Sequence, residues 1–339
     1  MKEVQNMKKY MRYISLLTLV LIAAILVCGC EIPGLEKTEH TVRFYVDGEL
    51  YSEARVTTGS TVTFPKNPSK ENQIFVGWYT DGLFSTEFNA ARSIYTDLNL
   101  YAYFTLDAIL LTNTITDRVM SSVVTVHNKS YNATMGGFIE TEVNTSQGSG
   151  VVIDISGGWC YVLTNCHVAK REDGLAHQKI TVEDAWGNQF DAQIYQNPSH
   201  SEAAISEEYD LALVCFKYAP VKDNQTLAEI EMAESVSVGD YVVSLGTPEG
   251  QKNAITYGSV LSFQEITMED EDGGTSKMGF DVICHTADIE HGSSGGPLLD
   301  TQCRLVGLNF AGLNDGTYGC AIPIEKIHEF LDTYVYLKQ

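Results

Sequence analysis

Apolar and polar residues alternate along short stretches of this chain, which is the pattern of β-strands with one buried face. The clearest alternation is that of Val42, Phe44 and Val46, and Asp47-Gly48 then supplies the residues of a tight hairpin turn. Similar stretches recur as far as residue 104 and predict a small β-rich domain over residues 41–105. The further strand patterns of this domain lie at 49–56, 62–65, 75–79 and 98–104.

The rest of the chain, residues 106–339, carries longer and more apolar strand patterns, which predict a second and larger β domain. Helical patterns flank these strands. The first covers 106–120 and leads into a strand at 122–126, and the second covers 323–336, with Pro323 near its first turn. The main strand patterns between the two helices lie at 148–153, 161–164, 211–214, 236–246 and 305–312.

A basic and then apolar segment begins the chain. Its apolar stretch, 14–27, is shorter than the roughly 20 residues that a membrane-spanning helix needs. The stretch ends in Val27-Cys28-Gly29-Cys30, which resembles a bacterial lipobox, with cleavage before Cys30 and a lipid on its thiol. We therefore expect a lipoprotein signal at 1–30, a tether at 31–40, and a protein held by lipid on the extracytoplasmic face of the cell membrane. An uncleaved apolar anchor is the alternative.

The formal net charge of −22 narrows the classes of partner. Residues 1–30 hold four basic and one acidic side chain, so the remainder of the chain carries −25. Such a surface repels phosphate backbones, which excludes nucleic acid as a partner. The hydrophobic fraction of 44% is that of an ordinary globular protein with a core.

The hexapeptide Gly292-Ser293-Ser294-Gly295-Gly296-Pro297 is the strongest chemical signal in the sequence. Its glycines let the backbone turn tightly around Ser294 and direct N–H groups toward a point where negative charge could develop. A glycine-serine run can also be an ordinary loop. Whether the chain also supplies a base and a carboxylate decides between the two interpretations.

A serine hydroxyl becomes a nucleophile when a base removes its proton, and neutral histidine is the usual base near pH 7. His167 stands in a polar turn after the apolar stretch 161–164. Asp210 precedes the apolar strand 211–214, where an unpaired charge would be costly. We expect Asp210 to pair with His167 and fix its tautomer. His285 is closer to Ser294 in the sequence, but one base suffices, so a loop or surface position is expected for it.

Together with Gly148-Ser149-Gly150, these segments resemble the trypsin-like serine proteases of the HtrA (Deg) type over about residues 115–335. The resemblance implies an all-β fold, a trypsin-like double β-barrel with a carboxy-terminal helix. Its first barrel would be built from about 149–217, and its second would begin near 236. The resemblance also implies an exported serine endopeptidase that cleaves protein or peptide substrates through an acyl-enzyme and needs no metal or cofactor.

The resemblance assigns a role to each of three side chains. Ser294 would be the nucleophile, His167 the general base and Asp210 the carboxylate that orients the base. The other roles fall on the backbone of the nucleophile loop and of a nearby strand. The oxyanion hole would comprise Gly292 and Ser294 with Ser293 nearby, and the substrate-binding strand would present Asn309, Phe310 and Ala311.

Two positions near the nucleophile depart from the digestive trypsins. Ser293 replaces the aspartate that pairs with a new amino terminus in those enzymes, so activation by proteolysis is not expected. Asp288, six residues before Ser294, stands where trypsins place the carboxylate of their primary pocket, which predicts a preference for Lys or Arg. Proteases of the HtrA type carry a small residue there and prefer aliphatic side chains. Both specificities therefore stay open.

The domain at 41–105 resembles the Listeria–Bacteroides (internalin B-type) repeat through Gly77-Trp78-Tyr79 and Leu100-Tyr101-Ala102. Core packing of Trp78 is favoured over a carbohydrate-binding role, because aromatic residues dominate small β cores. We interpret the domain as a spacer or as a module that binds a surface ligand. The alternative function for the whole chain is a noncatalytic binding protein in which the protease fold serves as a scaffold.

Six cysteines follow Cys30. Several of them occupy apolar strand patterns, as in Leu213-Val214-Cys215-Phe216, and none has a metal-ligand spacing such as C-x₂-C. Buried free thiols are therefore favoured over a full set of disulfides, and no metal site is expected.

Overall fold

The computed structural model describes residues 38–134, 139–198, 202–247, 254–269, 275–312 and 318–335. The lipobox-like segment with Cys30 and the tether up to residue 37 lie outside these ranges. The chain forms two compact units, one of residues up to 68 with 75–103 and the other of 69–74 with 104 onward. Among the described residues, no helix is both long and apolar enough to cross a membrane.

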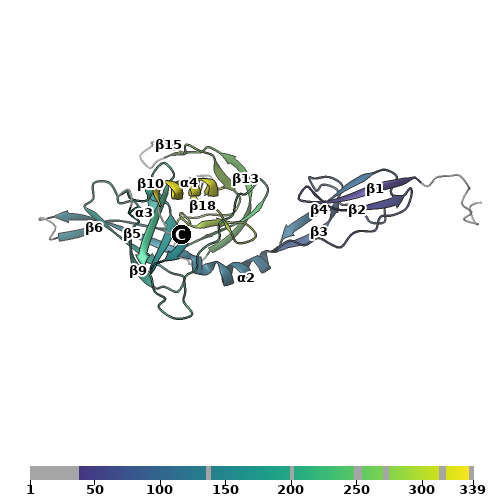
Figure 1. The fold of residues 1–339 in the computed structure, drawn as a ribbon. Coiled ribbons are helices and arrows are strands. Elements are labelled where there is room, and N and C mark those ends of the chain that lie inside the picture. The colour runs from purple at the N-terminus through teal and green to yellow at the C-terminus, as the bar shows by residue number, and fades with distance from the viewer. Residues whose placement is uncertain are drawn as a thin grey trace, which may run out of the picture. The chain divides into compact units, whose positions relative to one another are not determined.

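The first unit is a four-stranded sheet of β1 (Glu39–Val46), β2 (Glu49–Thr57), β3 (Gln73–Tyr79) and β4 (Leu98–Leu106) (Figure 1). The strand order is β2-β1-β4-β3, and β1 pairs antiparallel with β2 and parallel with β4. Asp47 and Gly48 have φ of 51° and 81°, so both take the left-handed conformation that the predicted hairpin turn requires.

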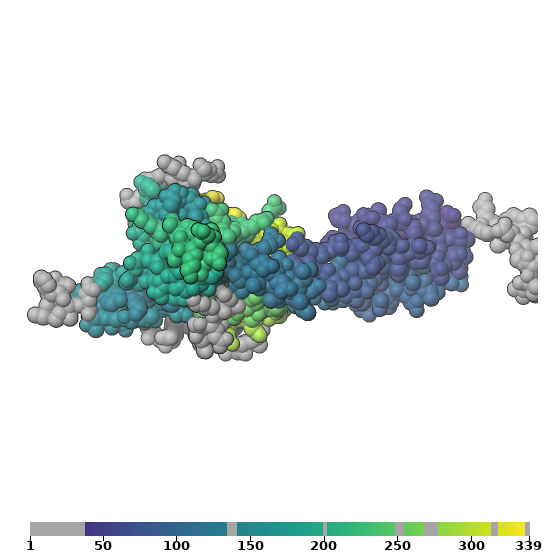
Figure 2. All heavy atoms as spheres, turned by 90° about the horizontal axis from the view of Figure 1, so that it is seen from below, coloured from purple at the N-terminus to yellow at the C-terminus, as the bar shows by residue number. Residues whose placement is uncertain are grey.

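Trp78 lies in the core of this unit, as predicted. It is 2% exposed, and its ring centroid lies 4.8 Å from that of Phe44. The predicted strand at 62–65 is wrong, because this stretch forms no strand. Pro65 has no N–H to donate to a ladder, and the apolar character of Val62 reflects burial in the core. The unit packs into one continuous body, drawn in purple and blue in Figure 2.

The second unit begins with α2 (Ala108–Arg118), which agrees with the helix predicted at 106–120. The carboxylate of Asp107 caps this helix by accepting a hydrogen bond from the N–H of Leu110. A short 3₁₀ turn, η1 (Met120–Ser122), then leads into the first barrel. Leu111 and Ile115 are fully buried, so α2 is fixed to the second unit by one apolar face.

The first barrel consists of β5 (Val123–Thr134), β6 (Ile139–Ser156), β7 (Trp159–Thr164), β8 (His177–Glu183), β9 (Gln189–Ile194) and β11 (Leu211–Lys217). It closes because β11 pairs with β9 as well as with β7. A short strand, β10 (Ile205–Ser206), adds to β11 outside the ring. A one-turn helix, α3 (Cys166–Ala169), follows β7.

The second barrel is closed in the order β12-β13-β16-β19-β18-β17. Its strands are β12 (Tyr241–Gly246), β13 (Ala254–Gln264), β16 (Val282–His285), β17 (Pro297–Leu299), β18 (Leu305–Gly312) and β19 (Gly319–Pro323), and β14 (Thr267–Glu269) and β15 (Thr275–Lys277) form a separate hairpin. Helix α4 (Ile324–Tyr334) follows, with Pro323 as its N-cap. The predicted all-β double barrel with a carboxy-terminal helix is thus confirmed.

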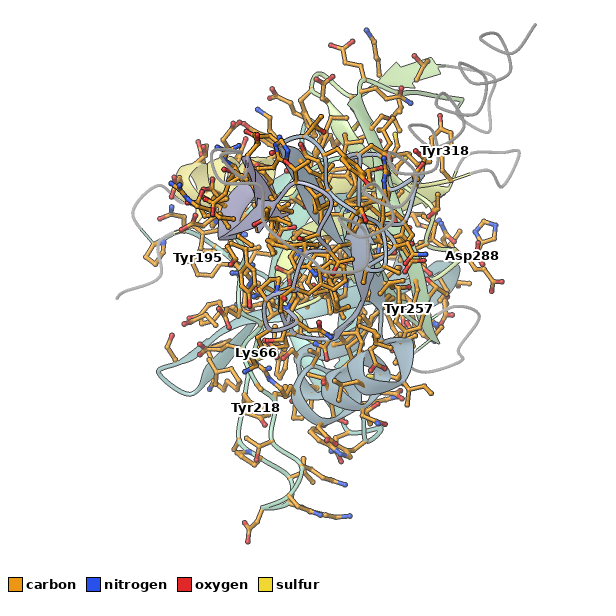
Figure 3. All side chains as sticks on the ribbon, turned by 90° about the vertical axis from the view of Figure 1, so that its right-hand side faces the viewer. Lys66, Tyr195, Tyr218, Tyr257, Asp288 and Tyr318 are labelled. Carbon is orange, nitrogen blue, oxygen red and sulfur yellow. The ribbon has the colours of Figure 1, made fainter. Side chains whose placement is uncertain are left out.

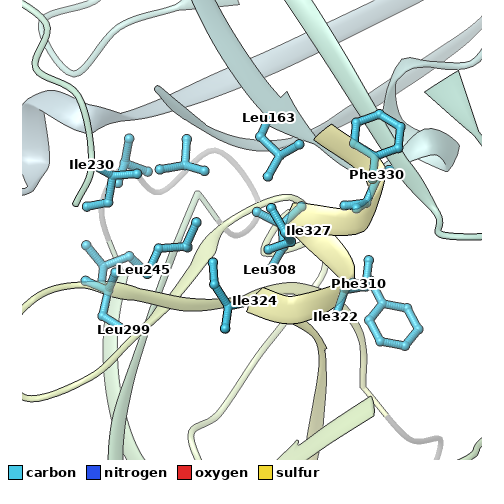
Figure 4. Close-up of a cluster of buried hydrophobic side chains, with 14 of the residues drawn as sticks. Leu163, Ile230, Leu245, Leu299, Leu308, Phe310, Ile322, Ile324, Ile327 and Phe330 are labelled. Carbon is cyan, nitrogen blue, oxygen red and sulfur yellow. The ribbon is translucent and has the colours of Figure 1, made fainter. Parts of the chain in front are cut away.

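One hydrophobic core joins the two barrels, and α4 closes it (Figure 4). Ile327 and Phe330 point from α4 into this core, where both are fully buried. They meet Leu163 of the first barrel and Leu308 of the second. The helix therefore fixes the position of one barrel against the other, and with it the geometry of any site between them.

Removal of the Phe330 ring tests this role of α4. We expect Phe330→Ala to lower the free energy of unfolding by about 3–5 kcal/mol, because it leaves a cavity in the shared core. Urea titration followed by tryptophan fluorescence measures the change. His328→Ala, at an exposed position of the same helix, is the control and should stay within about 0.5 kcal/mol of the wild type. Equal stability of the two variants would contradict the packing described here.

Candidate active site

Ser294 lies in a tight loop that precedes β17. Gly292 and Gly295 flank it with φ of 96° and 82°. Residues other than glycine adopt this backbone conformation only with strain. At Gly295 space is also lacking, because a Cβ there would lie 2.0 Å from the carbonyl oxygen of Ser149. The glycines of the motif are therefore required by the turn and by its close approach to β6.

Ser149 of β6 binds this loop from the first barrel. Its N–H donates to the carbonyl oxygen of Ser294 and its hydroxyl to that of Gly292, both at 2.7 Å. The same hydroxyl accepts a hydrogen bond from the N–H of Thr247, after β12, at 3.0 Å. The Thr164 hydroxyl donates to the carbonyl oxygen of Ser149 at 2.7 Å. Ser149 is fully buried, so water does not compete for these bonds.

His167 lies in α3, and its imidazole pairs with Asp210. The Nδ1 atom lies 2.8 Å from Oδ2 and 3.1 Å from Oδ1 of the carboxylate, and the N–H of His167 donates to Oδ1 at 3.0 Å. The Asp210 carbonyl oxygen accepts from the N–H of Cys166 and from the side-chain amide of Asn165. Because Nδ1 donates to the carboxylate, the neutral ring has Nε2 as its proton acceptor.

Asp210 reaches this position in a left-handed conformation, with φ of 50°, immediately before β11. A non-glycine residue there costs on the order of 1 kcal/mol, and the contacts of its carboxylate and carbonyl groups hold it in place. Its side chain is 13% exposed, whereas that of His167 is 50% exposed. A mostly buried carboxylate thus orients an imidazole whose other edge is open.

Asp210 also sets the protonation of the imidazole. Burial favours the neutral ring, but the hydrogen bond and the negative charge of Asp210 outweigh it, so the pKa of His167 is raised above its ordinary value. The raised pKa makes the neutral imidazole a stronger acceptor for the proton of a hydroxyl group.

Ser294 lies near this pair, but its hydroxyl binds another group. A Cβ on Gly148 would lie 2.8 Å from the Ser294 carbonyl oxygen and 2.6 Å from the Val168 side chain, so the two segments meet across this glycine. The Ser294 hydroxyl donates to the carbonyl oxygen of Phe310 at 3.2 Å. Within the described residues no hydrogen bond joins it to His167. The structure thus brings Ser294 close to His167 and Asp210, and a hydrogen bond directly links the latter two.

The strand that receives this hydroxyl is irregular at Phe310. The β18–β19 register shifts between Asn309 and Ala311, so Phe310 is the extra residue of a β-bulge, and its carbonyl group is free to face the nucleophile loop. The Asn309 side chain is fully buried. The predicted pairing of this strand with substrate concerns its backbone and stays a prediction, and the side chain of Ala311 is partly exposed.

Ser293 does not offer its N–H to an oxyanion. This N–H donates to the Glu290 carbonyl oxygen at 2.9 Å, and the Ser293 hydroxyl accepts from the N–H of Glu290 at 3.2 Å. The prediction that Ser293 belongs to the oxyanion hole is therefore wrong. No hydrogen bond among the described parts of the chain uses the N–H of Gly292 or Ser294, so these two donors remain.

Asp288 is exposed rather than placed at the base of a pocket (Figure 3). Its carbonyl oxygen accepts a hydrogen bond from the hydroxyl of Thr256 at 2.6 Å, which fixes the backbone while the carboxylate remains in solvent. An exposed carboxylate is hydrated and screened, so it attracts a cation only weakly. The position predicted for a buried specificity carboxylate is therefore wrong.

Ile289, which the sequence reasoning missed, lies where two strands end. Gly312 and Gly319 face each other in the β18–β19 register. A Cβ on Gly312 would lie 3.6 Å from Cγ1 of Ile289, and one on Gly319 would lie 3.0 Å from its Cδ1. Ile289 therefore packs against both glycines. The available signal was the pattern of one apolar residue, Ile289, between the charged residues Asp288 and Glu290.

A polar hollow of about 420 Å³ opens beside His167. The hairpin of β5 and β6 forms one side and residues 170–173 form the other. The Asn128 side-chain amide donates to the carbonyl oxygen of Lys170 at 2.8 Å, which holds the two sides together. The Lys170 ammonium is bound in turn by Glu207 at 2.7 Å. Polar side chains of both segments thus line the hollow next to the imidazole of His167.

Residues 148–308 match the family model of the trypsin-like peptidase domain, and residues 40–103 match that of the Listeria-Bacteroides repeat domain. The chain contains a trypsin-like peptidase domain. The matched range begins at the glycine that separates Val168 from Ser294 and includes His167, Asp210 and Ser294. The repeat match agrees with the four-stranded first unit.

Curated relatives of the peptidase domain include the putative serine protease HhoA of Synechocystis sp., 32% identical over 188 residues, which are 55% of this chain and 42% of that protein. Serine protease HTRA1 of Xenopus tropicalis is 30% identical over 57% of this chain and 37% of its own length. A probable periplasmic serine protease do/HhoA-like of Haemophilus influenzae is 34% identical over 52% of this chain and 34% of its own. The chain spans less than half the length of each relative.

The fold of the peptidase domain also matches a solved structure. The Rv3671c protease of M. tuberculosis, in its active form, superposes with a TM-score of 0.51 and 23% identity, covering 69% of this chain and 88% of that chain. This likeness supports the double-barrel fold.

The cysteines in the described parts of the peptidase domain form no disulfides. All six are free and buried, which agrees with the sequence interpretation. Burial raises the pKa of Cys166, next to His167, to about 12, so this thiol stays neutral and does not compete as a nucleophile. No cluster of His, Cys, Asp or Glu in the described residues is arranged to hold a metal ion.

The raised pKa of His167 can be measured by NMR titration of the imidazole. We expect a midpoint above 6.5 in the wild type and a lower one in Asp210→Asn, which removes the negative charge. Because the folded-state pKa is raised, the proton-linked stability is complete below the unfolded-state value and is lost as pH rises through the folded one. The stability difference between the two proteins should therefore shrink with rising pH. A wild-type midpoint at or below 6.5 would contradict this electrostatic account.

Proposed function

We propose that this protein is a serine endopeptidase that cleaves protein or peptide substrates through an acyl-enzyme. The observation that carries the proposal is the pair of a mostly buried Asp210 and a half-exposed His167 beside Ser294, whose loop has two N–H groups without an acceptor among the described residues. A carboxylate, an imidazole and a hydroxyl in this arrangement are the groups that acyl transfer needs. The identity to serine proteases supports the same conclusion.

Substrate binding would release the nucleophile. In this structure the Ser294 hydroxyl donates a hydrogen bond to the carbonyl oxygen of Phe310. A substrate chain that pairs with β18 brings backbone N–H groups to this strand, as extended peptides do at exposed strand edges. A substrate N–H that binds the Phe310 carbonyl displaces the hydroxyl, which then turns to Nε2 of His167.

The reaction then follows from the positions of these groups. His167 takes the proton of Ser294 as the oxygen attacks the substrate carbonyl, and Asp210 stabilises the imidazolium that forms. The N–H groups of Gly292 and Ser294 stabilise the oxyanion. His167 gives its proton to the leaving amine, and it then activates a water molecule that hydrolyses the acyl-enzyme.

We further propose that the peptidase acts at the extracytoplasmic face of a membrane, held by a lipid on Cys30. The lipobox-like sequence supports the anchor, and the Haemophilus influenzae relative is named as periplasmic. Two or more acyl chains would hold the protein stably, at about 0.8 kcal/mol per buried CH₂. The repeat domain would then act as a spacer or bind a surface ligand.

Labelling with a fluorophosphonate reagent tests the proposed chemistry. We expect the fragment from residue 31 to be labelled on Ser294 and to cleave denatured casein, and Ser294→Ala to lose both by at least about 10⁴-fold. Ser235→Ala, an exposed serine of the same unit, should behave as the wild type. An intact, folded wild type that resists labelling and cleavage under all conditions would favour the noncatalytic alternative.

We also propose that the residue before the cleaved bond is a small aliphatic one rather than Lys or Arg. The apolar side chain of Ile289 packs against Gly312 and Gly319 at the end of β18, and the carboxylate of Asp288 faces solvent. A cation placed against Ile289 would lose hydration without gaining a partner, whereas an aliphatic side chain gains about 0.8 kcal/mol per buried CH₂.

A peptide library measures this preference. We expect Val, Ala or Ile before the cleaved bond, and we expect Asp288→Asn to leave the profile within about two-fold of the wild type. Ile289→Ala should widen acceptance toward Leu and Phe, because it enlarges the space beside the two glycines. A profile led by Lys or Arg that Asp288→Asn abolishes would overturn the proposal.

A further inference from the structure

His285 is a titratable group in the core of the second barrel, and the proposed chemistry does not use it. It lies in β16 and is fully buried, which corrects the loop or surface position expected from the sequence. Gly319 lies opposite it in the β16–β19 register, and a Cβ there would lie 2.6 Å from the imidazole Cε1. The ring therefore occupies space that a glycine leaves open.

The ring of His285 binds the side chain of Asn309, at 3.1 Å between Nε2 and Oδ1. The amide nitrogen of Asn309 donates to the hydroxyl of Ser244 at 3.0 Å and to the carbonyl oxygen of Pro297 at 3.3 Å, so the amide oxygen must face the ring. An amide oxygen only accepts, so Nε2 carries the proton. Burial lowers the pKa of His285 to about 4 despite this hydrogen bond, which keeps the ring neutral at pH 7.

Asn309 in turn binds the residues that follow the nucleophile. Its carbonyl oxygen accepts from the N–H of Gly295 at 2.8 Å, and its N–H donates to the carbonyl oxygen of Gly296 at 2.9 Å. With the side-chain contact to Pro297, it touches all three residues after Ser294. Asn309 also directly precedes Phe310, whose carbonyl group holds the Ser294 hydroxyl.

We propose that His285 and Asn309 are positioning residues that fix the nucleophile loop against β18. The inference rests on the proposed function, because the loop is the one that carries Ser294. Without the donor on His285, the amide oxygen of Asn309 is buried and unpaired, and the side chain gains by turning toward other partners. This rotation of the Asn309 side chain breaks its hydrogen bonds with Ser244 and Pro297. The nucleophile loop is then held less firmly against β18.

Two substitutions at one position test the pair. His285→Leu fills similar space without a donor, whereas His285→Gln retains an amide N–H that can reach Asn309. His328→Leu, at an exposed position on α4, is the matched control. Thermal unfolding establishes which variants are folded at the assay temperature, and rates are normalised to the folded fraction.

We expect His285→Leu to lower kcat on a cleaved peptide and the rate of fluorophosphonate labelling by about 10–100-fold, because a misplacement of about 1 Å can cost 10²-fold. KM should change by less than about two-fold, and the acid limb of the pH profile should not move, because His167 is untouched. His285→Gln should restore most of the rate. Wild-type kcat and labelling in a folded His285→Leu would overturn the proposal.

Hydrogen exchange gives a readout that does not depend on activity. The Gly295 amide is protected by Asn309, so a peptide covering 292–298 should exchange at least about 10-fold faster in His285→Leu than in His328→Leu. This separates the two ideas. If the wild type is unreactive but the exchange changes in this way, the proposed function is contradicted and the positioning role of His285 and Asn309 is supported. If the wild type is reactive and His285→Leu changes neither exchange nor rate, only the positioning role of His285 and Asn309 is contradicted.

Discussion

The hydrogen bond between the Ser149 amide and the Ser294 carbonyl oxygen is the contact on which this site depends. It joins β6 of one barrel to a loop of the other in a region from which water is excluded. The close approach that it requires explains the glycine at position 295, because any side chain there would overlap the backbone of β6. Packing against β6 thus requires glycine at position 295, independently of the chemistry of Ser294.

The two halves of the site are stabilised differently. In the first barrel, Asp210 lies in strained backbone; His167 donates to its carboxylate, Asn165 and Cys166 donate to its carbonyl oxygen, and electrostatics dominate. In the second barrel, neutral groups do the corresponding work through a fully buried histidine and asparagine. Neutral pairs cost less to desolvate than ions, so the loop with the reacting oxygen is held without adding a charge that would compete with Asp210 for the imidazole.

The sequence was sufficient wherever a residue's role depends on its immediate neighbours. The Asp47-Gly48 turn and the strand at 305–312 follow from local patterns. Local patterns also singled out His167, Asp210 and Ser294, whose catalytic roles stay a prediction. The sequence failed where contacts distant in sequence decide. His285 is buried because Gly319, from another strand, leaves room for its ring. No periodicity in a single segment carries that information.

Helix α4 follows every barrel strand along the chain, yet it supplies the side chains that hold the barrels together. A chain emerging from a ribosome or a translocation channel therefore exposes all the strands before the barrels can be fixed against each other. Until Ile327 and Phe330 emerge, the core between the barrels lacks two of its fully buried side chains. The order of elements thus completes the shared core, and with it the support for the loop of Ser294, only after synthesis has passed the last strand of the second barrel.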